Sequence, residues 1–535
     1  MNRSFTGVVA ALFVAICAVP TPVKAGVANE AQCLALKQAD FSGTVDAPSH
    51  ILEARIEASN SDQPALCRVT GLVRSNTGFE MHLPLERWNG KFLQAGCAGF
   101  CGRTMGWYCR DATARGYACI VSDMGHRSAL ASPAAPSLSA LWAYGSDSAQ
   151  IDHGFRSSHA TTVIGKELVQ RLYGRSPDRS YFNGCSEGGR EALIAAQRFP
   201  WDFDGIIAGA PAMDAGRTFL TALWNERALH DQQGRPILDA NALTMIRSAV
   251  LKSCDKNDGI VDGVIGDPGL CRFDPAEMMC DEGAGKQCLS PQQVQSVRAL
   301  IDGPATSSGQ SIAPGLSPAA AFGRLLAPGT SGRSVAASYG EEFFRYLGFS
   351  PAPGVGWNAS EFDFDRDWRR TGVVDALLSA TNPDLRRFRD AGGKLIIYHG
   401  WDDYLISPAI TSDYFETVEA AMGGREATSA FARLFMVPGM DHCALGGGAW
   451  SVDFLSYLDE WADEGKAPDQ LVAHRPILPS DPAAAFARIG RYPVPAPEIE
   501  FSRPLYPYPQ RYHYKGKGDT SQESSFGKQA NGVRK

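Results

Sequence analysis

A serine between two glycines gives the clearest chemical signal in this sequence of 535 residues. Residues 184–188 read Gly-Cys-Ser-Glu-Gly, a G-x-S-x-G pattern with Ser186 at its centre. Residues 180–183 are typical of a short strand, and residues 188–198 have the spacing of an amphipathic helix. At such a strand-to-helix turn the serine hydroxyl is exposed as a nucleophile, and the next N–H, that of Glu187, can stabilise an oxyanion. The segment therefore predicts acyl transfer through Ser186, with a chance glycine-rich turn as the alternative.

Candidate partners for this serine follow two later apolar runs. The run at 394–398 leads into Asp402 and Asp403, and the run at 433–437 leads into His442. In an α/β-hydrolase the catalytic residues follow the order serine, acid, histidine. His442 would therefore be the general base, and one of the two aspartates would orient its ring and support the imidazolium that forms.

Cysteines stand directly beside two of these residues. Cys185 precedes Ser186, and Cys443 follows His442. If the serine and the histidine are within hydrogen-bonding distance, the two cysteines are close enough to form a disulfide. Such a bond would clamp the loop of the nucleophile to the loop of the base. The alternative is that the two cysteines are unrelated buried thiols.

Strand-like and helix-like patterns alternate around these residues. Runs at 116–122 and 205–209 indicate strands, and the spacing over 163–172 indicates a helix between them. With the order of the triad, this alternation predicts an α/β-hydrolase fold with a mainly parallel sheet. The alternation stops near Pro211 and returns only at residue 394, so we expect a large inserted lid domain. The predicted divisions are a first part of the core at 26–211, a lid domain at 212–390, and a second part of the core with a C-terminal strap at 391–535.

The first 25 residues resemble an export signal rather than part of the fold. Arg3 supplies the positive charge, residues 7–19 form an apolar run, and Val23 and Ala25 are small residues suited to cleavage. A membrane anchor is the alternative, but the apolar run is shorter than the roughly 20 residues that span a bilayer. We therefore expect a secreted or periplasmic protein that has no membrane partner after cleavage.

Export changes the interpretation of the cysteines. Of the 13 cysteines, Cys17 lies in the signal, which leaves an even number for an oxidising compartment where disulfides are common. Spacing suggests three pairs, namely Cys33 with Cys67, Cys254 with Cys271, and Cys280 with Cys288. A zinc site is disfavoured because the remaining cluster has no C-x-x-C pair and no histidine among its members, Cys97, Cys101, Cys109 and Cys119.

Composition excludes other classes of protein. Hydrophobic residues make up 44% of the chain and charged residues 20%, which is typical of a folded rather than a disordered protein. There are 51 basic and 58 acidic residues, giving a net charge of −7 without a basic block in the body of the chain. A nucleic-acid partner is therefore not expected.

An acidic loop in the predicted lid could bind a metal ion. Asp255, Asp258 and Asp262 lie within eight residues, and carboxylates that close repel one another unless a cation or solvent relieves them. Ca²⁺ prefers such oxygen ligands. An EF-hand is excluded because Gly259 and Gly266 occupy positions where that loop needs ligands. The alternative is a solvated acidic turn.

These motifs together resemble those of a known enzyme family. Cys185-Ser186, Asp403 and His442-Cys443 are similar to the signature of the tannase and feruloyl esterase family, which includes bacterial mono(2-hydroxyethyl) terephthalate hydrolases. The resemblance covers most of the mature chain. It takes in the segments 94–102, 184–190, 398–403, 437–443 and 503–519.

The resemblance implies a role for each candidate residue of the triad. Ser186 would be the nucleophile, His442 the base, and Asp403, rather than Asp402, the acid. A disulfide between Cys185 and Cys443 would link the two catalytic loops.

The resemblance also implies an oxyanion hole and a bound metal ion. The N–H of Glu187 would be one oxyanion donor, and the second would be the N–H of Cys97 or its neighbour Ala98, although the family commonly has glycines there. A structural Ca²⁺ in the lid would bind the side chains of three aspartates and two backbone carbonyls, from Asp255, Asp258, Asp262, Ile260 and Val264.

The implied activity is hydrolysis of an aromatic acid ester, of feruloyl, galloyl or terephthaloyl type, through an acyl-serine intermediate. Alternatives are an esterase for other small carboxylesters or polyester fragments, or a binding protein without catalysis. Specificity would depend on lid residues that contact the aromatic ring, and the sequence alone does not select them. The aromatic and cationic residues late in the lid are Trp357, Phe362, Phe364, Trp368, Arg369 and Arg370.

Overall fold

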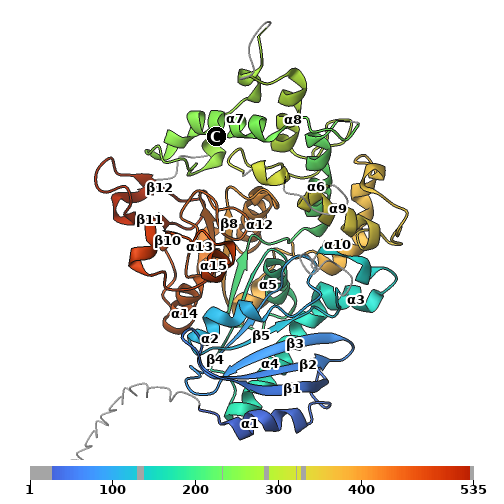
Figure 1. Cartoon of the computed structure of the whole chain (residues 1–535), viewed down its shortest axis with the longest axis vertical. Helices are drawn as coiled ribbons and strands as arrows, with labels where there is room; N and C mark the ends of the chain where they lie inside the picture. The colour runs from blue at the N-terminus through green and yellow to red at the C-terminus, as the bar shows by residue number, and fades with distance from the viewer. Residues whose placement is uncertain are drawn as a thin grey trace, which may run out of the picture.

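The structure is a computed structural model of the whole chain, drawn in Figure 1. It describes residues 27–128, 138–231, 233–281, 288–320, 322–326 and 333–529. The predicted signal at 1–25 lies outside these residues. Among the described helices, none is long and apolar enough to cross a membrane.

A nine-stranded sheet organises the described part of the chain. Strands β1 to β3 and β5 pair antiparallel, and β5, β4, β6, β7, β8 and β9 pair parallel, which confirms the predicted mainly parallel α/β sheet. In spatial order the strands are β1 (Ser49–Glu57), β2 (Leu66–Val73), β3 (Thr77–Pro84), β5 (Ala118–Ser122), β4 (Lys91–Ala95), β6 (Arg179–Cys185), β7 (Gly205–Gly209), β8 (Lys394–Gly400) and β9 (Ala432–Val437).

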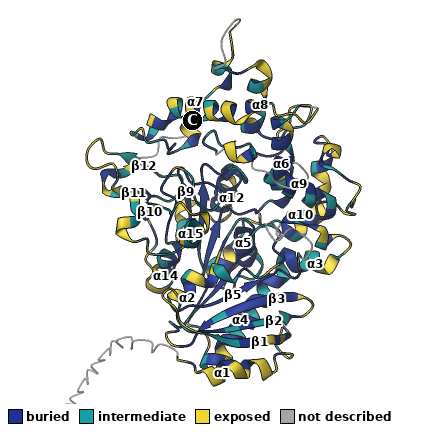
Figure 2. Ribbon diagram, in the orientation of Figure 1, coloured by how far each residue is buried: buried dark blue, intermediate teal, exposed yellow. Residues whose placement is uncertain are grey.

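Alternate residues of these strands face two separate apolar layers. On β4, Phe92 packs into one layer and Leu93 into the other, because successive side chains of a strand point to opposite faces. The first layer is covered by α4 (Ser157–Tyr173), α5 (Glu187–Arg198) and α12 (Pro408–Ala421). The second is covered by α2 (Arg110–Ala114) and α14 (Phe454–Glu464). Figure 2 shows the buried sheet between these helices. Four further helices outside the insertion are short: α1 (Glu30–Ala35), α3 (Asp147–Ile151), α11 (Arg386–Asp390) and α13 (Arg425–Ser429).

The insertion lies between β7 and β8, which are neighbouring parallel strands. Its helices form two apolar clusters, one of which also includes Phe100, Ala140 and Ala143 of the first part of the chain. They lie beyond the carboxyl ends of the parallel strands in Figure 1. They are α6 (Ala215–Leu229), α7 (Ala240–Cys254), α8 (Pro291–Asp302), α9 (Val335–Tyr346) and α10 (Gly372–Leu378). The helices of the insertion therefore lie over the carboxyl ends of the strands, which is where α/β proteins bind ligands.

The C-terminal segment crosses from the core to the insertion. It forms two small antiparallel pairs and one helix, β10 (Leu471–Pro476) with β11 (Ile499–Leu505), β12 (Arg511–Tyr514) with β13 (Phe526–Gln529), and α15 (Pro482–Arg488). Arg503 donates to Asp262 at 2.7 Å, so β11 is tied to the acidic loop of the insertion.

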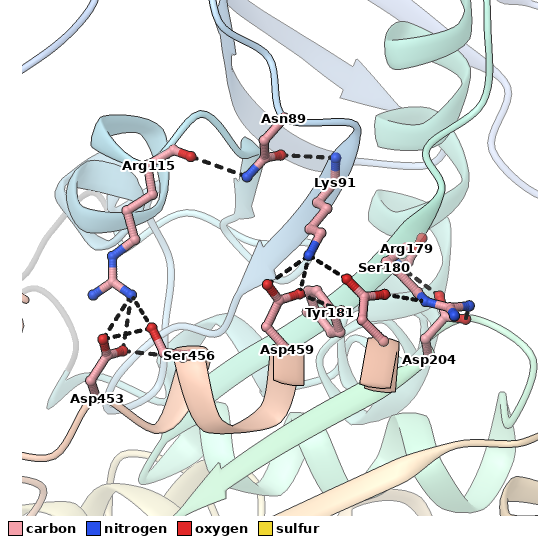
Figure 3. A network of polar contacts seen from close by, with 11 residues as sticks. Asn89, Lys91, Arg115, Arg179, Ser180, Tyr181, Asp204, Asp453, Ser456 and Asp459 are labelled. Carbon is pink, nitrogen blue, oxygen red and sulfur yellow. Dashed lines mark hydrogen bonds and ion pairs between the residues drawn. The ribbon is translucent and has the colours of Figure 1, made fainter. Parts of the chain in front are cut away.

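At the amino ends of the central strands β4 and β6, a polar network joins these strands to α14 (Figure 3). The ammonium group of Lys91 bonds to Asp459 and, at 2.7 Å, to Asp463. Tyr181 donates to Asp459 at 2.6 Å, and Arg179 donates to Asp463 at 2.8 Å. The network fixes the helix against strands far from it in sequence, on the side away from the candidate site.

Six disulfides lie in the described residues. The three pairs that spacing suggested are present, and the cluster weighed as a zinc site instead forms two disulfides. These are Cys97–Cys101 and Cys109–Cys119, and Cys185–Cys443 is the sixth.

Candidate active site

Ser186 lies at the sharp turn between β6 and α5. Its backbone has φ 64° and ψ −119°, a left-handed conformation that a non-glycine residue rarely adopts and that is common at functional sites. The glycines around it are required by close approach. A Cβ on Gly184 would lie 2.4 Å from the carbonyl oxygen of Gly188, and one on Gly188 would lie 2.9 Å from that of Cys97. The spacing therefore lets the serine project at the carboxyl edge of the sheet.

The three candidate catalytic residues form one chain of hydrogen bonds. His442 Nε2 lies 2.9 Å from Ser186 Oγ, and His442 Nδ1 lies 2.7 Å from Asp403 Oδ2. With Nδ1 protonated, His442 donates to Asp403 and its Nε2 accepts from the serine hydroxyl. This arrangement can remove the proton of the serine as its oxygen attacks a carbonyl carbon.

Asp403 is fully buried and is held by several donors. The N–H groups of Leu405 and Ile406 donate to Oδ1 at 2.8 and 3.0 Å, and His399 Nε2 lies 3.1 Å from Oδ2. Burial raises the pKa of Asp403, but the charge of His442 and the hydrogen bonds from His399 and His442 outweigh it and hold that pKa well below its ordinary value. The carboxylate is therefore ionised and fixed in orientation.

The electrostatics of His442 suit a general base. Burial lowers the pKa of His442, but the charge of Asp403 and the hydrogen bond to it raise the pKa above its ordinary value. Asp403 therefore stabilises the imidazolium that forms when His442 takes a proton.

Asp402 has a different partner from its neighbour. It forms an ion pair with Arg247 of α7 at 3.2 Å, and burial raises its pKa to about 7. This geometry accounts for the choice of Asp403 as the acid. The other histidine of the segment, His399, bonds to Thr411 at 2.8 Å as well as to Asp403.

A disulfide joins the residues next to the nucleophile and the base. Cys185 and Cys443 are bonded, with their Cα atoms 6.0 Å apart and a separation of 258 positions in sequence. The bond connects the turn after β6 to the loop after β9, the two segments that must keep Ser186 and His442 in contact.

The structure places the two expected oxyanion donors in different surroundings. Glu187 is the first residue of α5, where backbone N–H groups have no partner within the helix, as a donor to an oxyanion requires. Cys97 does not fit its expected role, because its N–H donates to the buried carboxyl of Glu191 at 2.9 Å. The alternative, Ala98, lines the cavity beside Ser186.

A cavity of about 520 Å³ opens at the serine. Phe219, Ala222 and Tyr339 line it from the insertion, and Tyr108 and Phe486 line it from the other side. No lysine or arginine is among the described residues that line it. The walls can therefore hold a flat apolar ring without a charged partner.

The aromatic and cationic residues late in the insertion, from Trp357 to Arg370, do not line this cavity. Trp357, Phe362 and Phe364 pack in the apolar core of the insertion. Arg370 pairs with Asp367 at 3.0 Å, and the guanidinium of Arg369 lies 4.4 Å from the ring centre of Trp368.

The acidic loop places three aspartates close together but with unequal partners. Asp255 accepts from the N–H of Asp262 and of Gly263, at 3.2 and 3.0 Å. Asp262 also pairs with Arg503, a contact that no sequence pattern indicated. Asp258 is buried with one carboxylate oxygen unpaired, and burial together with the charges of Asp262 and Asp255 raises its pKa to about 7.

The buried, unpaired oxygen of Asp258 is an atom that a bound cation would satisfy, whereas Asp255 and Asp262 already accept from backbone N–H groups and from Arg503. The N–H groups of Ile260 and Val264, in the same loop, donate to the carboxylates of Asp258 and Asp262 at 3.3 and 3.2 Å.

Comparison with known proteins identifies the family. The family model "Tannase and feruloyl esterase" matches residues 65–528, most of the chain. The chain belongs to the tannase and feruloyl esterase family. This confirms the resemblance and the α/β-hydrolase fold, and it makes the protein a carboxylic ester hydrolase of the tannase and feruloyl esterase type.

Relatives and solved structures of this family match most of the chain. Mono(2-hydroxyethyl) terephthalate hydrolase of Piscinibacter sakaiensis is 32% identical, over 93% of this chain and 92% of the relative. Probable feruloyl esterase B-2 of Aspergillus flavus is 31% identical, over 76% and 79%. Feruloyl esterase B from Aspergillus oryzae has a similar structure, with a TM-score of 0.78 and 24% identity over 93% and 99%. Tannin acyl hydrolase from Aspergillus niger gives 0.73 and 21% over 94% and 95%.

Proposed function

We propose that this member of the tannase and feruloyl esterase family is an exported serine esterase that hydrolyses esters of aromatic acids through an acyl-serine intermediate. The hydrogen-bonded chain from Ser186 through His442 to Asp403 carries the proposal. Export is supported by the signal-like N-terminus and by the disulfides, which persist in oxidising compartments.

The geometry supports a two-step reaction. Ser186 Oγ attacks the ester carbonyl while His442 Nε2 takes its proton, and the oxyanion accepts from the N–H groups of Glu187 and Ala98. The tetrahedral intermediate collapses, the C–O bond to the alcohol breaks, and His442 returns the proton to the leaving oxygen. Water then attacks the acyl-serine by the same route and releases the acid. Asp403 keeps its charge throughout and stabilises the imidazolium.

The walls of the cavity favour an acyl ring without charge. Phe219, Tyr339 and Tyr108 offer flat surfaces, whereas a free carboxylate on the ring would be buried without a cation among the described lining residues. Burying an unpaired charge is strongly unfavourable. We therefore assign feruloyl-type or galloyl-type esters as substrates in preference to a terephthalate monoester.

A comparison of matched esters tests this assignment. We expect kcat/KM for methyl ferulate or methyl gallate to exceed that for mono(2-hydroxyethyl) terephthalate by at least about tenfold, which corresponds to about 1.4 kcal/mol. The bis(2-hydroxyethyl) ester is the control, because it has the same ring and lacks only the free carboxylate, and it should recover most of the difference. If the monoester is the best of the four substrates, the assignment of an uncharged ring is wrong.

We also propose that the loop at 255–264 holds one structural Ca²⁺, bound by Asp255, Asp258 and Asp262 with the carbonyls of Ile260 and Val264. When bound, the ion supplies charge neutralisation within the insertion. The triad lies outside this ligand set, so its chemistry needs no metal from this loop.

Removal of calcium should lower the melting temperature. A ligand that binds only the folded state at 100 times its Kd adds about 2.7 kcal/mol to the free energy of unfolding. We expect chelated protein to regain several degrees of Tm with Ca²⁺ but not with the same concentration of Mg²⁺, measured by calorimetry. The variant Asp258→Asn should lose this response. An unchanged Tm of the wild type with and without Ca²⁺ would show a solvated acidic turn instead.

A further inference from the structure

One residue beside the nucleophile, Cys97, is held through both of its backbone polar groups by the helix that follows Ser186. The N–H of Cys97 donates to Glu191 Oε1 at 2.9 Å. The carbonyl oxygen of Cys97 accepts from the N–H of Gly188 at 3.0 Å. Glu191 and Gly188 are both residues of α5, so the loop after β4 takes its orientation from the helix that begins at the nucleophile.

The contact of the Cys97 carbonyl with Gly188 fixes the direction of the proposed second oxyanion donor, and the contact with Glu191 holds the peptide group just before it. The carbonyl of Cys97 and the N–H of Ala98 belong to one planar, trans peptide unit and point in opposite directions. Once the carbonyl is bonded to Gly188, the N–H of Ala98 has one direction in space. The loop has little freedom to relax around it, because a Cβ on Gly96 would lie 2.5 Å from the Cα of Gly188.

We infer that Glu191 is a positioning residue of the oxyanion hole, acting on Ala98 through the N–H of Cys97. The inference rests on the proposed function. The side chain of Glu191 is 2% exposed, and a buried carboxyl placed on a loop amide needs a reason beyond packing. The same loop carries the disulfide Cys97–Cys101, whose sulfur atoms lie within 4.8 Å of a Glu191 carboxyl oxygen.

The charges around Glu191 agree with this role. Glu187 accepts from Arg190 at 2.9 Å and lies 3.3 Å from His153 Nε2, so its carboxylate has its own partners. Burial and the charge of Glu187 raise the pKa of Glu191 to about 8, which leaves this carboxyl mostly protonated at pH 7. A neutral group can orient the loop without adding a negative charge behind the site where the oxyanion forms.

Two variants separate positioning from packing. In Glu191→Gln the side-chain carbonyl can still accept from Cys97, so we expect kcat within about threefold of wild type. In Glu191→Leu the volume is nearly kept but the acceptor is lost, so kcat should fall about 10- to 100-fold while KM changes less than about threefold. Loss of one oxyanion donor elsewhere lowers kcat on the order of 100-fold. The assay is hydrolysis of methyl ferulate at a temperature where circular dichroism shows each variant folded.

Glu419→Leu is the matched control for removal of a buried carboxylate. Glu419 is 8% exposed on α12 and pairs with Arg425 at 3.0 Å, away from the loop at Cys97. We expect a lower Tm and an unchanged kcat. A purely structural role of Glu191 would give this same pattern in Glu191→Leu.

The outcomes distinguish this inference from the proposed function. A folded Glu191→Leu with wild-type kcat, or a Glu191→Gln as impaired as Glu191→Leu, would overturn the role of Glu191. If Glu191→Leu fails to fold, Glu191→Asp replaces it, because the shorter arm withdraws the acceptor from Cys97 and should lower kcat as well. Wild-type activity that persists in Ser186→Ala would instead overturn the proposed function itself.

Discussion

Replacement of Ser186 by alanine should lower kcat on methyl ferulate by at least about 1,000-fold while the fold stays intact. The substitution removes the oxygen that is proposed to form the acyl bond, and what remains is the oxyanion hole and substrate binding. Alanine meets the same backbone strain at φ 64° as serine, so the turn itself gains no new penalty. The measurement is steady-state hydrolysis with Tm recorded in parallel.

Ser412→Ala serves as the control for this variant. Ser412 is a buried serine of α12 whose hydroxyl donates to the carbonyl of Ala409 at 3.1 Å, outside the site. It should keep wild-type kcat. A Ser186→Ala enzyme with more than a tenth of wild-type activity would place the nucleophile elsewhere.

Replacement of Asp403 by asparagine should lower kcat by about 1,000-fold for a reason that the geometry makes specific. The N–H groups of Leu405 and Ile406 donate to Oδ1 and would select the carbonyl oxygen of the asparagine for that position. Its NH₂ group would then replace Oδ2 and face Nδ1 of His442, where it can only donate. His442 would be driven to the tautomer with its proton on Nε2, which cannot accept the proton of Ser186.

The adjacent aspartate provides the matched control. Asp402 is also buried but pairs with Arg247 instead of His442. Asp402→Asn should therefore change kcat by less than about tenfold. Equal losses in the two variants would mean that the acid of the triad has been assigned to the wrong residue. Both variants are compared at pH 7 on the same ester.

Local patterns sufficed to predict the strand-to-helix turn that holds Ser186, because this turn needs glycines at fixed positions beside the serine. The order of serine, acid and histidine along the chain was enough to place His442. The choice between Asp402 and Asp403 depended on resemblance, since both follow the same strand. Only the fold shows why one reaches His442 and the other pairs with Arg247, which lies in the insertion.

Contacts between distant segments could not be predicted from periodicity. Glu191 lies 94 residues from Cys97, so nothing in either segment indicated that the N–H of Cys97 has a buried partner. Lys91 and Asp459 are 368 residues apart, and each alone has the pattern of an ordinary surface charge. Periodicity also could not tell which aromatic residues late in the insertion line the cavity, because such residues suit the core of the insertion equally well.

Covalent trapping of the nucleophile tests the central claim most directly. Diethyl 4-nitrophenyl phosphate reacts with an activated serine, which forms an O–P bond as 4-nitrophenolate leaves, and the phosphorylated product hydrolyses slowly. We predict one equivalent of 4-nitrophenolate released per chain, loss of esterase activity in proportion, and a diethylphosphoryl group on the peptide that contains Ser186. Ser186→Ala should take up no label. Full inactivation with the label on any other residue would contradict the assignment of Ser186 as the nucleophile.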